Sequence, residues 1–340
     1  RAVGKGGSMA TASLDVVGIG NAIVDVLAHA EDGFLDAHGL AKGAMTLIDA
    51  EAAEALYAAM GPAVEISGGS AANTLAGLAS LGGQGAFIGK VRNDQLGAVF
   101  AHDIRAAGTG FDTEFAADGP PTARCLVLVT PDAQRTMQTY LGAAVDLGPE
   151  DVEPGVIESA GVTYLEGYLW DPPRAKAAFL KAAEIAHGAG RRVALSLSDP
   201  FCVERHRAEF RDLVENHVDI LFANEAEIVA LYETADFDSS LEAVRGRCEL
   251  VALTRSEKGS VVLKGDETHA VAAAPVDRVV DTTGAGDLYA AGFLYGAVRD
   301  FAPAECARLG GLAAAEAISH LGARPETPLA ALIAAARPAG

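Results

Sequence analysis

The sequence predicts an α/β protein with a doubly wound, mostly parallel sheet flanked by helices and a small β lid inserted into it. From residue 162 onward strands alternate regularly with helices, which implies right-handed βαβ units. Two β-rich pieces, approximately 40–67 and 111–141, do not follow this alternation, so we assign them to the lid. The chain has 340 residues, 50% of them hydrophobic, and is long enough to bury a large core. We therefore expect a single domain over residues 9–330 and interpret residues 1–8 as a cloning remnant.

The elements of the N-terminal half are each bounded by a turn or cap. Short apolar runs predict strands at 15–20, 43–49, 62–67 and 85–91. A helix is predicted from Ser70 to the glycine stop at Gly82, and another over 94–108. Strands are also predicted at 111–116, 123–130 and 135–141, separated by the turn sequences DGPP and TPDAQ.

The C-terminal half has longer helices between its strands. Strands are predicted at 162–168, 192–198, 218–223 and 250–254, with a hairpin over 260–273 that turns at KGDE. Helices are predicted at 173–190 and 224–232. A further strand should end near Val280, followed by a helix from about Gly286. The last long helix should start at Pro303 and end before Gly322.

Composition excludes several classes of protein. The formal net charge is −20, from 26 basic and 46 acidic residues, which argues against nucleic acid or an anionic membrane as a partner. No apolar run reaches the length of about 18 residues that a membrane span requires. The four cysteines are far apart, so neither a structural zinc site nor a disulfide framework is expected. A reducing cytoplasmic location fits this pattern.

The early sequence GIGNAIVD invites comparison with a dinucleotide-binding turn, but Ile23 stands where the third glycine is required. A nicotinamide dehydrogenase is therefore disfavoured. Two polar residues, Asn21 and Asp25, follow the strand, and ligands of open α/β sheets bind beyond the carboxyl ends of strands. A carboxylate at that position can accept two hydrogen bonds from a vicinal diol. Alternatively, Asn21 caps a turn and Asp25 lies on the surface.

Two further sequences place polar residues at helix starts. In SGGSAANT, Gly68 and Gly69 allow close approach of the backbone to a ligand, and Asn73 can reach the same crevice from the first helical turn. Capping by Ser70 alone would not explain both glycines. In NEAE, Asn224 and Glu227 lie on one helix face and could hold a hydrated Mg²⁺, although taken alone ordinary helix capping explains this block more simply.

The sequence VVDTTGAGD combines a helix start with a carboxylate. The free amides of the first helical turn form an anion site, and Gly284 and Gly286 remove side chains that would block it. Asp287 stands directly beside that site and could take a proton from a hydroxyl that attacks a phosphoryl group. The oxygens of Asp281 and Thr283 could hold a cation near the turn. An acid placed only to suit the helix dipole would explain Asp287 but not the glycines.

These sequences resemble the PfkB (ribokinase-like) family of carbohydrate and nucleoside kinases. DTTGAGDLYAAGF is similar to the family's C-terminal signature, and GGSAAN, NEAE and LTRSEKG stand in the expected order. The resemblance covers roughly residues 15–328 and is greatest to the adenosine kinase group, on GIGNAIVDV, ISGGSAANT, RTMQTYLGAA and LSDPFCVER with VDILFANEAE. It implies a ribokinase-like fold, with ATP and Mg²⁺ as cofactors and K⁺ as an open option.

On the acceptor side, the resemblance implies that Asp25 binds the ribose hydroxyls with help from Gly69 and Asn73, next to Gly68. Asn21 would lie near the nucleobase, with Tyr168 and Leu169 as candidates for its wall. Asp287 would be the general base on the 5′-hydroxyl, and the anion-hole amides would come from Gly284, Ala285 and Gly286.

On the ATP side, the resemblance implies that Asn224 and Glu227 organise Mg²⁺ and its waters, and that Arg135 of the lid steadies the phosphates. The remaining expected contacts to ATP are made by Thr254, Gly259, Gly311 and His320. The ATP turn departs from the family pattern TxGxxG, because Ser256 takes the place of the first glycine.

The predicted function is transfer of the γ-phosphoryl group of ATP to the 5′-hydroxyl of a nucleoside, most simply adenosine in purine salvage, by a cytoplasmic monomer or homodimer. A sugar kinase of the same family, of ribokinase or fructokinase type, is the alternative. A non-catalytic nucleoside-binding homologue is a remote third hypothesis, which an intact Asp287 disfavours.

Overall fold

Two β-sheets organise the described chain, which in this computed structural model comprises residues 12–132 and 134–335. The nine-stranded sheet has the order β14-β13-β12-β11-β10-β9-β1-β5-β6, and the five-stranded sheet has the order β3-β8-β7-β2-β4. Residues 1–8, interpreted from sequence as a cloning remnant, lie outside the described residues.

The large sheet is parallel except for its last two strands. The parallel strands are β1 (Leu14–Ile19), β5 (Gly85–Ile88), β6 (Thr109–Gly110), β9 (Ala160–Glu166), β10 (Arg192–Ser196), β11 (Ile220–Asn224) and β12 (Leu250–Thr254). The hairpin β13 (Ser260–Lys264) and β14 (Glu267–Val271) adds antiparallel at one edge. Both faces are buried: Val16 belongs to one hydrophobic core and Val17 to the other. Strands covered on both faces explain the continuous apolar runs in the sequence.

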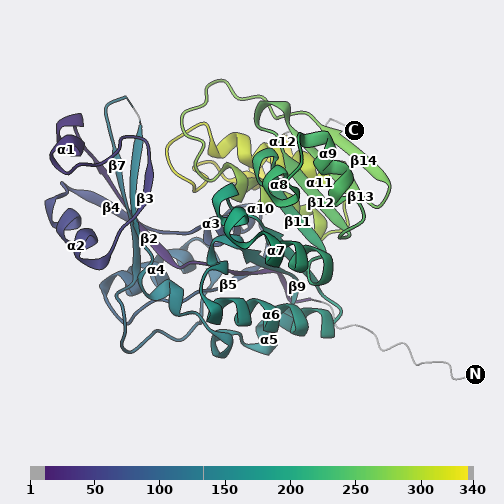
Figure 1. Ribbon diagram of the computed structural model, residues 1–340, viewed down its shortest axis with the longest axis horizontal. Helices are drawn as coiled ribbons and strands as arrows, with labels where there is room; N and C mark the ends of the chain where they lie inside the picture. The colour runs from purple at the N-terminus through teal and green to yellow at the C-terminus, as the bar shows by residue number, and fades with distance from the viewer. Residues whose placement is uncertain (1–11, 133, 336–340) are drawn as a thin grey trace, which may run out of the picture.

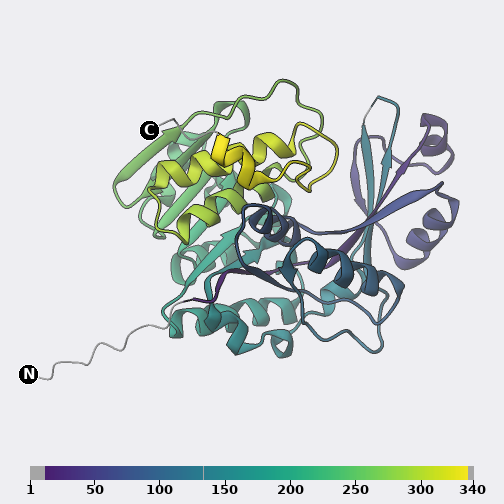
Figure 2. The ribbon, with the colours of Figure 1, turned by 180° about the vertical axis from the view of Figure 1, so that it is seen from behind.

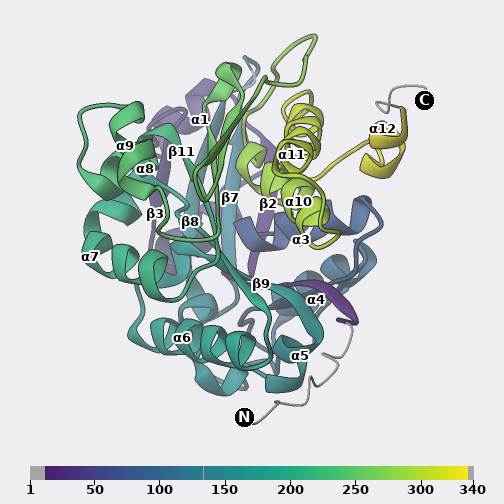
Figure 3. The same cartoon turned by 90° about the vertical axis from the view of Figure 1, so that its right-hand side faces the viewer.

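Helices cover the two faces of the large sheet (Figure 3). One face carries α5 (Pro154–Ser159), α6 (Pro173–Gly188), α7 (Pro200–Asn216), α8 (Glu225–Tyr232) and α9 (Phe237–Val244). The other carries α3 (Ser70–Ser80), α4 (Gln95–Ala106), α10 (Ala285–Ala297) and α11 (Pro303–Ala317), with α12 (Leu329–Ala335) outside them. Short 3₁₀ turns are η1 (Gly142–Asp146), η2 (Pro149–Asp151), η3 (Gly167–Trp170) and η4 (Ser256–Lys258).

The small sheet projects from one side of the molecule (Figures 1 and 2). It consists of β2 (Ile23–His29), β3 (Met45–Leu47), β4 (Ala63–Gly68), β7 (Ala123–Val129) and β8 (Arg135–Tyr140). Helices α1 (Asp32–Ala37) and α2 (Ala50–Ala59) belong to the same part of the chain. All strands except β2 lie in the two β-rich pieces seen in the sequence. The predicted fold class, an α/β protein with a small β lid, is confirmed.

Two predicted strands are wrong. Residues 111–116 form no strand; Ala116 makes only an isolated bridge with Arg92, because the ring of Phe111 packs into the core against Phe87 and Phe100. The stretch that ends at Val280 joins neither sheet. Its backbone is tied instead to the end of α11, where the amide of Val280 donates to the carbonyl of Ile318 (2.8 Å). Within the described residues, no helix is long and apolar enough to cross a bilayer.

Candidate functional site

A cavity of about 1220 Å³ lies between the small sheet and the carboxyl edge of the large sheet. The last residues of four neighbouring parallel strands line it: Glu166, Ser196, Asn224 and Thr254. The small sheet contributes Asp25 and Arg135, and the start of α10 contributes residues 284–287. The polar residues predicted from separate sequence stretches therefore meet at one edge, as expected for an open parallel sheet.

Asp287, in the first turn of α10, is held by two side chains of α3. Its carboxylate accepts hydrogen bonds from Ser70 Oγ (2.6 Å) and Asn73 Nδ2 (3.0 Å). Burial raises the pKa of Asp287 above its usual value, while these hydrogen bonds and the charge of Arg324 oppose the shift. The side chain is a fixed carboxylate able to accept a proton from a ligand hydroxyl in the cavity.

The turn before Asp287 forms an open cradle at the start of α10. Gly284 has φ of 76°, and a Cβ there would lie 2.5 Å from that of Ala323, so this position requires glycine. A Cβ on Gly286 would meet no atom within 4 Å. Both residues and Ala285 line the cavity. The amide of Ala285 donates to the carbonyl oxygen of Thr282 (3.2 Å), so an anion here would be met by the amides of Gly284 and Gly286. An anionic group can approach this turn closely.

Asp25 faces the cavity from the middle of β2. Burial raises the pKa of Asp25 to about 6, the charges of Arg324 and Arg135 lower it, and Asp287 raises it further. A Cβ on Gly68 would lie 2.4 Å from the Asp25 carboxylate, and one on Gly69 (φ 99°) would lie 2.2 Å from the carbonyl oxygen of Asn21. Gly68 is therefore needed for close packing against Asp25 of β2, and Gly69 for close packing against the β1–β2 connection.

Glu166, which the sequence analysis did not single out, organises the region around Asn21. Its Oε1 accepts from the side chain and the amide of Asn21 (2.7 and 3.3 Å), and its Oε2 accepts from the amide of Ala71 (2.8 Å). Burial raises the pKa of Glu166 to about 7. The side chain of Asn21 is thus turned toward Glu166, and its proposed contact with a nucleobase stays a prediction. The one sequence clue was an acid at the end of a buried strand.

Asn224 and Glu227 satisfy each other in a reciprocal cap of α8. Asn224 Oδ1 accepts from the amide of Glu227 (2.9 Å), while Glu227 accepts from the amide and the Nδ2 of Asn224 (2.9 and 2.7 Å). Burial raises the pKa of Glu227 to about 7. Each carboxylate oxygen keeps a free acceptor site, so the pair can still bind water around Mg²⁺ but is not arranged as a set of direct ligands.

Arg135 of β8 reaches across the cavity to the loop before α10. Its Nη1 lies 2.6 Å from Asp281 Oδ2, and both side chains are less than 10% exposed. Asp281 also accepts from the amide and hydroxyl of Thr283 and from the amide of Gly322. These hydrogen bonds and the charge of Arg135 keep the pKa of Asp281 below its usual value despite burial. A monovalent cation at Asp281 would have to displace Arg135, so the residues present do not fit K⁺ as they stand.

Of the four further residues expected to contact ATP, three line the cavity and His320 does not. Thr254, Gly259 and Gly311 line the cavity. Gly259 has φ of 86° and would place a Cβ 2.1 Å from the carbonyl oxygen of Val271, which explains the glycine. His320 is not among the lining residues; its Nε2 lies 3.2 Å from Glu316 Oε2 within α11 and the turn after it.

The aromatic side chains at the acceptor end differ from expectation. Tyr168 lines the cavity, whereas Leu169 is 1% exposed and packs in the core between the sheet and α6. Phe201, which the sequence analysis did not name as a site residue, also lines the cavity and is 73% exposed. Two features of the sequence pointed to it: its place directly after Pro200, and LSDPFCVER, one of the sequences that carry the resemblance to the adenosine kinase group.

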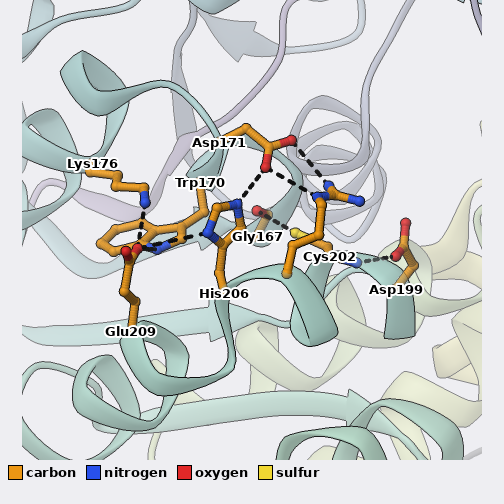
Figure 4. A network of polar contacts seen from close by, with 9 residues as sticks. Gly167, Trp170, Asp171, Lys176, Asp199, Cys202, His206 and Glu209 are labelled. Carbon is orange, nitrogen blue, oxygen red and sulfur yellow. Dashed lines mark hydrogen bonds and ion pairs between the residues drawn. The ribbon is translucent and has the colours of Figure 1, made fainter.

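The start of α7, which carries Phe201, is fastened to the segment after β9 (Figure 4). Cys202 Sγ donates to the carbonyl oxygen of Gly167 (3.2 Å). His206, where the backbone of α7 leaves helical geometry (φ −125°), pairs with Asp171. The exposed ring of Phe201 is therefore presented to the cavity by an anchored backbone.

The fold defined by these two sheets is the ribokinase-like α/β fold. The model of the pfkB family carbohydrate kinases matches residues 44–330, and the chain belongs to this family.

The chain is also similar to individual members. The structure of adenosine kinase from Sinorhizobium meliloti is 56% identical, covers 96% of this chain and 100% of that chain, and has a TM-score of 0.88. The structure of a probable sugar kinase from Rhizobium etli is 52% identical, with coverages of 96% and 99% and a TM-score of 0.89. Adenosine kinase from Saccharomyces cerevisiae is 27% identical, over 83% of this chain and 88% of that protein.

Proposed function

We propose that this kinase transfers the γ-phosphoryl group of Mg·ATP to the 5′-hydroxyl of a nucleoside, with adenosine as the acceptor. The observation that carries the proposal is the apolar surface around Asp25. Ile23 and Leu27 flank Asp25 on the same face of β2, because side chains two residues apart share a face of a strand. Cys125, Val127 and Met137 of the neighbouring strands pack with them.

This arrangement fits an acceptor with two different ends. A ribose diol can bind the Asp25 carboxylate, while a flat base can lie on the surrounding apolar side chains. Tyr168 and Phe201, which line the cavity from the large-sheet side, supply aromatic surface for the same base. A free sugar carries hydroxyl groups on every side and would leave this apolar surface without a partner.

The chemistry follows from the residues at the start of α10. Asp287 accepts the proton of the attacking 5′-hydroxyl as the new O–P bond forms and the bond between the γ-phosphorus and the bridging oxygen of ADP breaks. The amides near Gly284 and Gly286 stabilise the charge on the transferring group. Mg²⁺ bound with ATP neutralises phosphate charge, and Asn224 and Glu227 would bind its waters.

The proposal includes the setting of the reaction. The names of the similar proteins leave both adenosine and a sugar as acceptors, and the apolar surface favours the nucleoside. We further propose that the enzyme serves purine salvage in the cytoplasm, as a monomer or homodimer.

An acceptor panel tests the proposal. With Mg·ATP, we expect kcat/KM for adenosine to exceed that for ribose and fructose by at least about a hundredfold, equivalent to about 2.7 kcal/mol. Phe201→Ala should raise the KM for adenosine and leave the KM for ATP unchanged, while Leu180→Ala, on the exposed side of α6, should change neither. A preference for a free sugar would overturn the nucleoside assignment, and adenosine binding without ADP formation would support the non-catalytic alternative.

A further inference from the structure

Arg324 lines the cavity from the segment between α11 and α12, and no sequence pattern identified it. The segment Gly322–Arg324 runs along the turn at the start of α10. The amide of Gly322 donates to Asp281 Oδ2 (2.9 Å), and Ala323 packs where a side chain on Gly284 would lie. Arg324 is thus placed by the same loop that supports the anion cradle.

The guanidinium of Arg324 bridges the two ends of the glycine-rich turn between β4 and α3. Its Nη2 donates to the carbonyl oxygen (2.5 Å) and the hydroxyl (2.9 Å) of Ser67, and its Nη1 donates to the carbonyl oxygen of Ala72 (3.2 Å). The segment between these contacts, residues 68–71, includes Ser70 at the start of α3, and Asn73 follows Ala72 directly. Ser70 and Asn73 are the two residues that hold the Asp287 carboxylate.

Within the part of the chain that the structure describes, no direct ion pair neutralises the charge of Arg324. Among the described residues its hydrogen-bonded partners are two carbonyl oxygens and one hydroxyl, and its buried Nε has no partner. Burial lowers the pKa of Arg324, and the charges of Asp103, Asp25 and Asp287 oppose that shift. Arg135, by contrast, is paired with Asp281. An arginine without a direct carboxylate partner therefore lines the same cavity as Asp25 and Asp287.

We propose that Arg324 is a positioning residue for phosphoryl transfer: it clamps the turn that holds Asp287 and supplies the counter-charge to Asp287 and Asp25. This inference rests on the proposed function. The clamp acts through Ser70 and Asn73, and the counter-charge acts across the cavity. The two contributions can be separated, because lysine keeps the charge but loses the planar fork that bridges Ser67 and Ala72.

The electrostatic part has a defined sign. The positive charge of Arg324 lowers the pKa values of Asp25 and Asp287, which burial raises. Removing the charge raises both, so the basic form of Asp287 is reached only at higher pH. Arg135 also lowers the pKa of Asp25. Asp25 in turn raises the pKa of Cys125, and Asp287 raises the pKa values of Tyr164, Glu166 and Tyr168, so these groups are coupled to the two carboxylates.

The test compares the pH dependence of kcat in the wild type, Arg324→Met, Arg324→Lys and the control Arg308→Met, which removes a charge that is paired with Glu305 on α11. In Arg324→Met we expect the acidic limb of the pH profile, the range in which kcat rises as Asp287 loses its proton, to move up by about one pH unit. Its kcat on the plateau should fall about ten- to a hundredfold, because the base is misplaced. Arg324→Lys should keep the wild-type limb with a lower plateau, and Arg308→Met should match the wild type.

The outcomes separate this inference from the proposed function. If the acceptor panel selects a sugar, the profiles are measured with that sugar. If the wild type shows no turnover, the proposed function fails, and ¹³C carboxyl titrations of Asp25 and Asp287 in wild type and Arg324→Met still test the counter-charge. A folded Arg324→Met with the wild-type limb overturns the inference. If that variant does not fold, Arg324→Lys decides: a shifted limb overturns the inference, and an unshifted limb with a lowered plateau supports it.

Discussion

At the scale of single residues, Asp287 is the carboxylate on which the proposed transfer depends. Asp287→Asn keeps the size of the side chain and removes its ability to accept a proton, so we expect kcat to fall about 10²- to 10⁴-fold. Adenosine affinity, measured by calorimetry, should change little. Asp266→Asn is the matched control, because it makes the same change in the exposed turn between β13 and β14, outside the cavity lining. Near-normal turnover in Asp287→Asn would contradict the assignment of the general base.

Glu166 gives a prediction about stability against pH. Its pKa is raised from 4.5 to about 7 by burial, so the folded protein holds the proton more tightly than the unfolded chain. Its contribution to stability is therefore full below about pH 4.5 and is lost as the pH rises to about 7. Glu166→Gln lacks this titration. Relative to the wild type, its free energy of unfolding should increase between pH 5 and 8, by up to about 3 kcal/mol.

Urea unfolding of the wild type and Glu166→Gln between pH 5 and 8 measures the difference in their free energies of unfolding. Gln cannot accept from Asn21 and Ala71 as the carboxylate does, so the variant has a constant loss at every pH. The prediction therefore concerns how the difference in free energy of unfolding between Glu166→Gln and the wild type changes with pH. If that difference is constant between pH 5 and 8, Glu166 does not titrate there.

At the scale of secondary structure elements, hydrophobic pattern and turn residues predicted the strands of the large sheet except the two-residue strand β6, because buried parallel strands are continuous apolar runs. The same reasoning missed α2, whose sequence AEAAEALYAA lies inside the β-rich piece 40–67 and is capped by Asp49. It also missed β2, because Asp25, which lies among the apolar residues of this strand, was interpreted as a polar residue that follows the end of the strand at 15–20. Residues 111–116 show the opposite error, since a packed ring replaced strand pairing.

The ion pair between Arg135 and Asp281 joins the small sheet to the loop before α10, and its removal should loosen that connection. We propose that Arg135 also contacts phosphate, through donors that its pairing with Asp281 does not use. In Arg135→Ala we therefore expect the KM for ATP to rise at least about tenfold, because a charge-assisted contact of that kind is worth about 1.5–3 kcal/mol. Amide hydrogen exchange in β8 should also be faster in the absence of nucleotide.

Arg124→Ala is the matched control for that variant. Arg124 lies on the neighbouring strand β7, is paired with Glu54 of α2 and does not line the cavity. It should leave the KM for ATP unchanged.

Replacing K⁺ by tetramethylammonium should leave wild-type activity unchanged, since Arg135 occupies Asp281. A strong K⁺ requirement would mean that Arg135 leaves Asp281 during turnover.

At the scale of the whole molecule, the sequence predicted the meeting of distant polar residues because the carboxyl ends of parallel strands share one edge. Asn224 and Thr254 line the cavity for this reason, whereas Asp25 reaches it from the small sheet and Asp287 from the first turn of α10, which follows no strand. Glu166 and Arg324 line the same cavity but were not foreseen. A single acid at a strand end, or a single arginine in a loop, has no spacing from which its partners can be inferred. Their roles depend on tertiary contacts between segments far apart in the chain.

The net charge of −20 acts on the molecule as a whole and gives a further prediction. It repels Mg·ATP at long range, while adenosine is neutral, so screening should help only the nucleotide. Between about 10 and 150 mM ionic strength, where the Debye length falls from about 30 to 8 Å, we expect the KM for ATP to decrease a few-fold. The KM for adenosine should stay constant and serves as the internal control. Steady-state kinetics in tetramethylammonium chloride measure both values without adding K⁺, and a KM for ATP that rises with salt would show that the local charges of Arg135 and Arg324 outweigh the net charge.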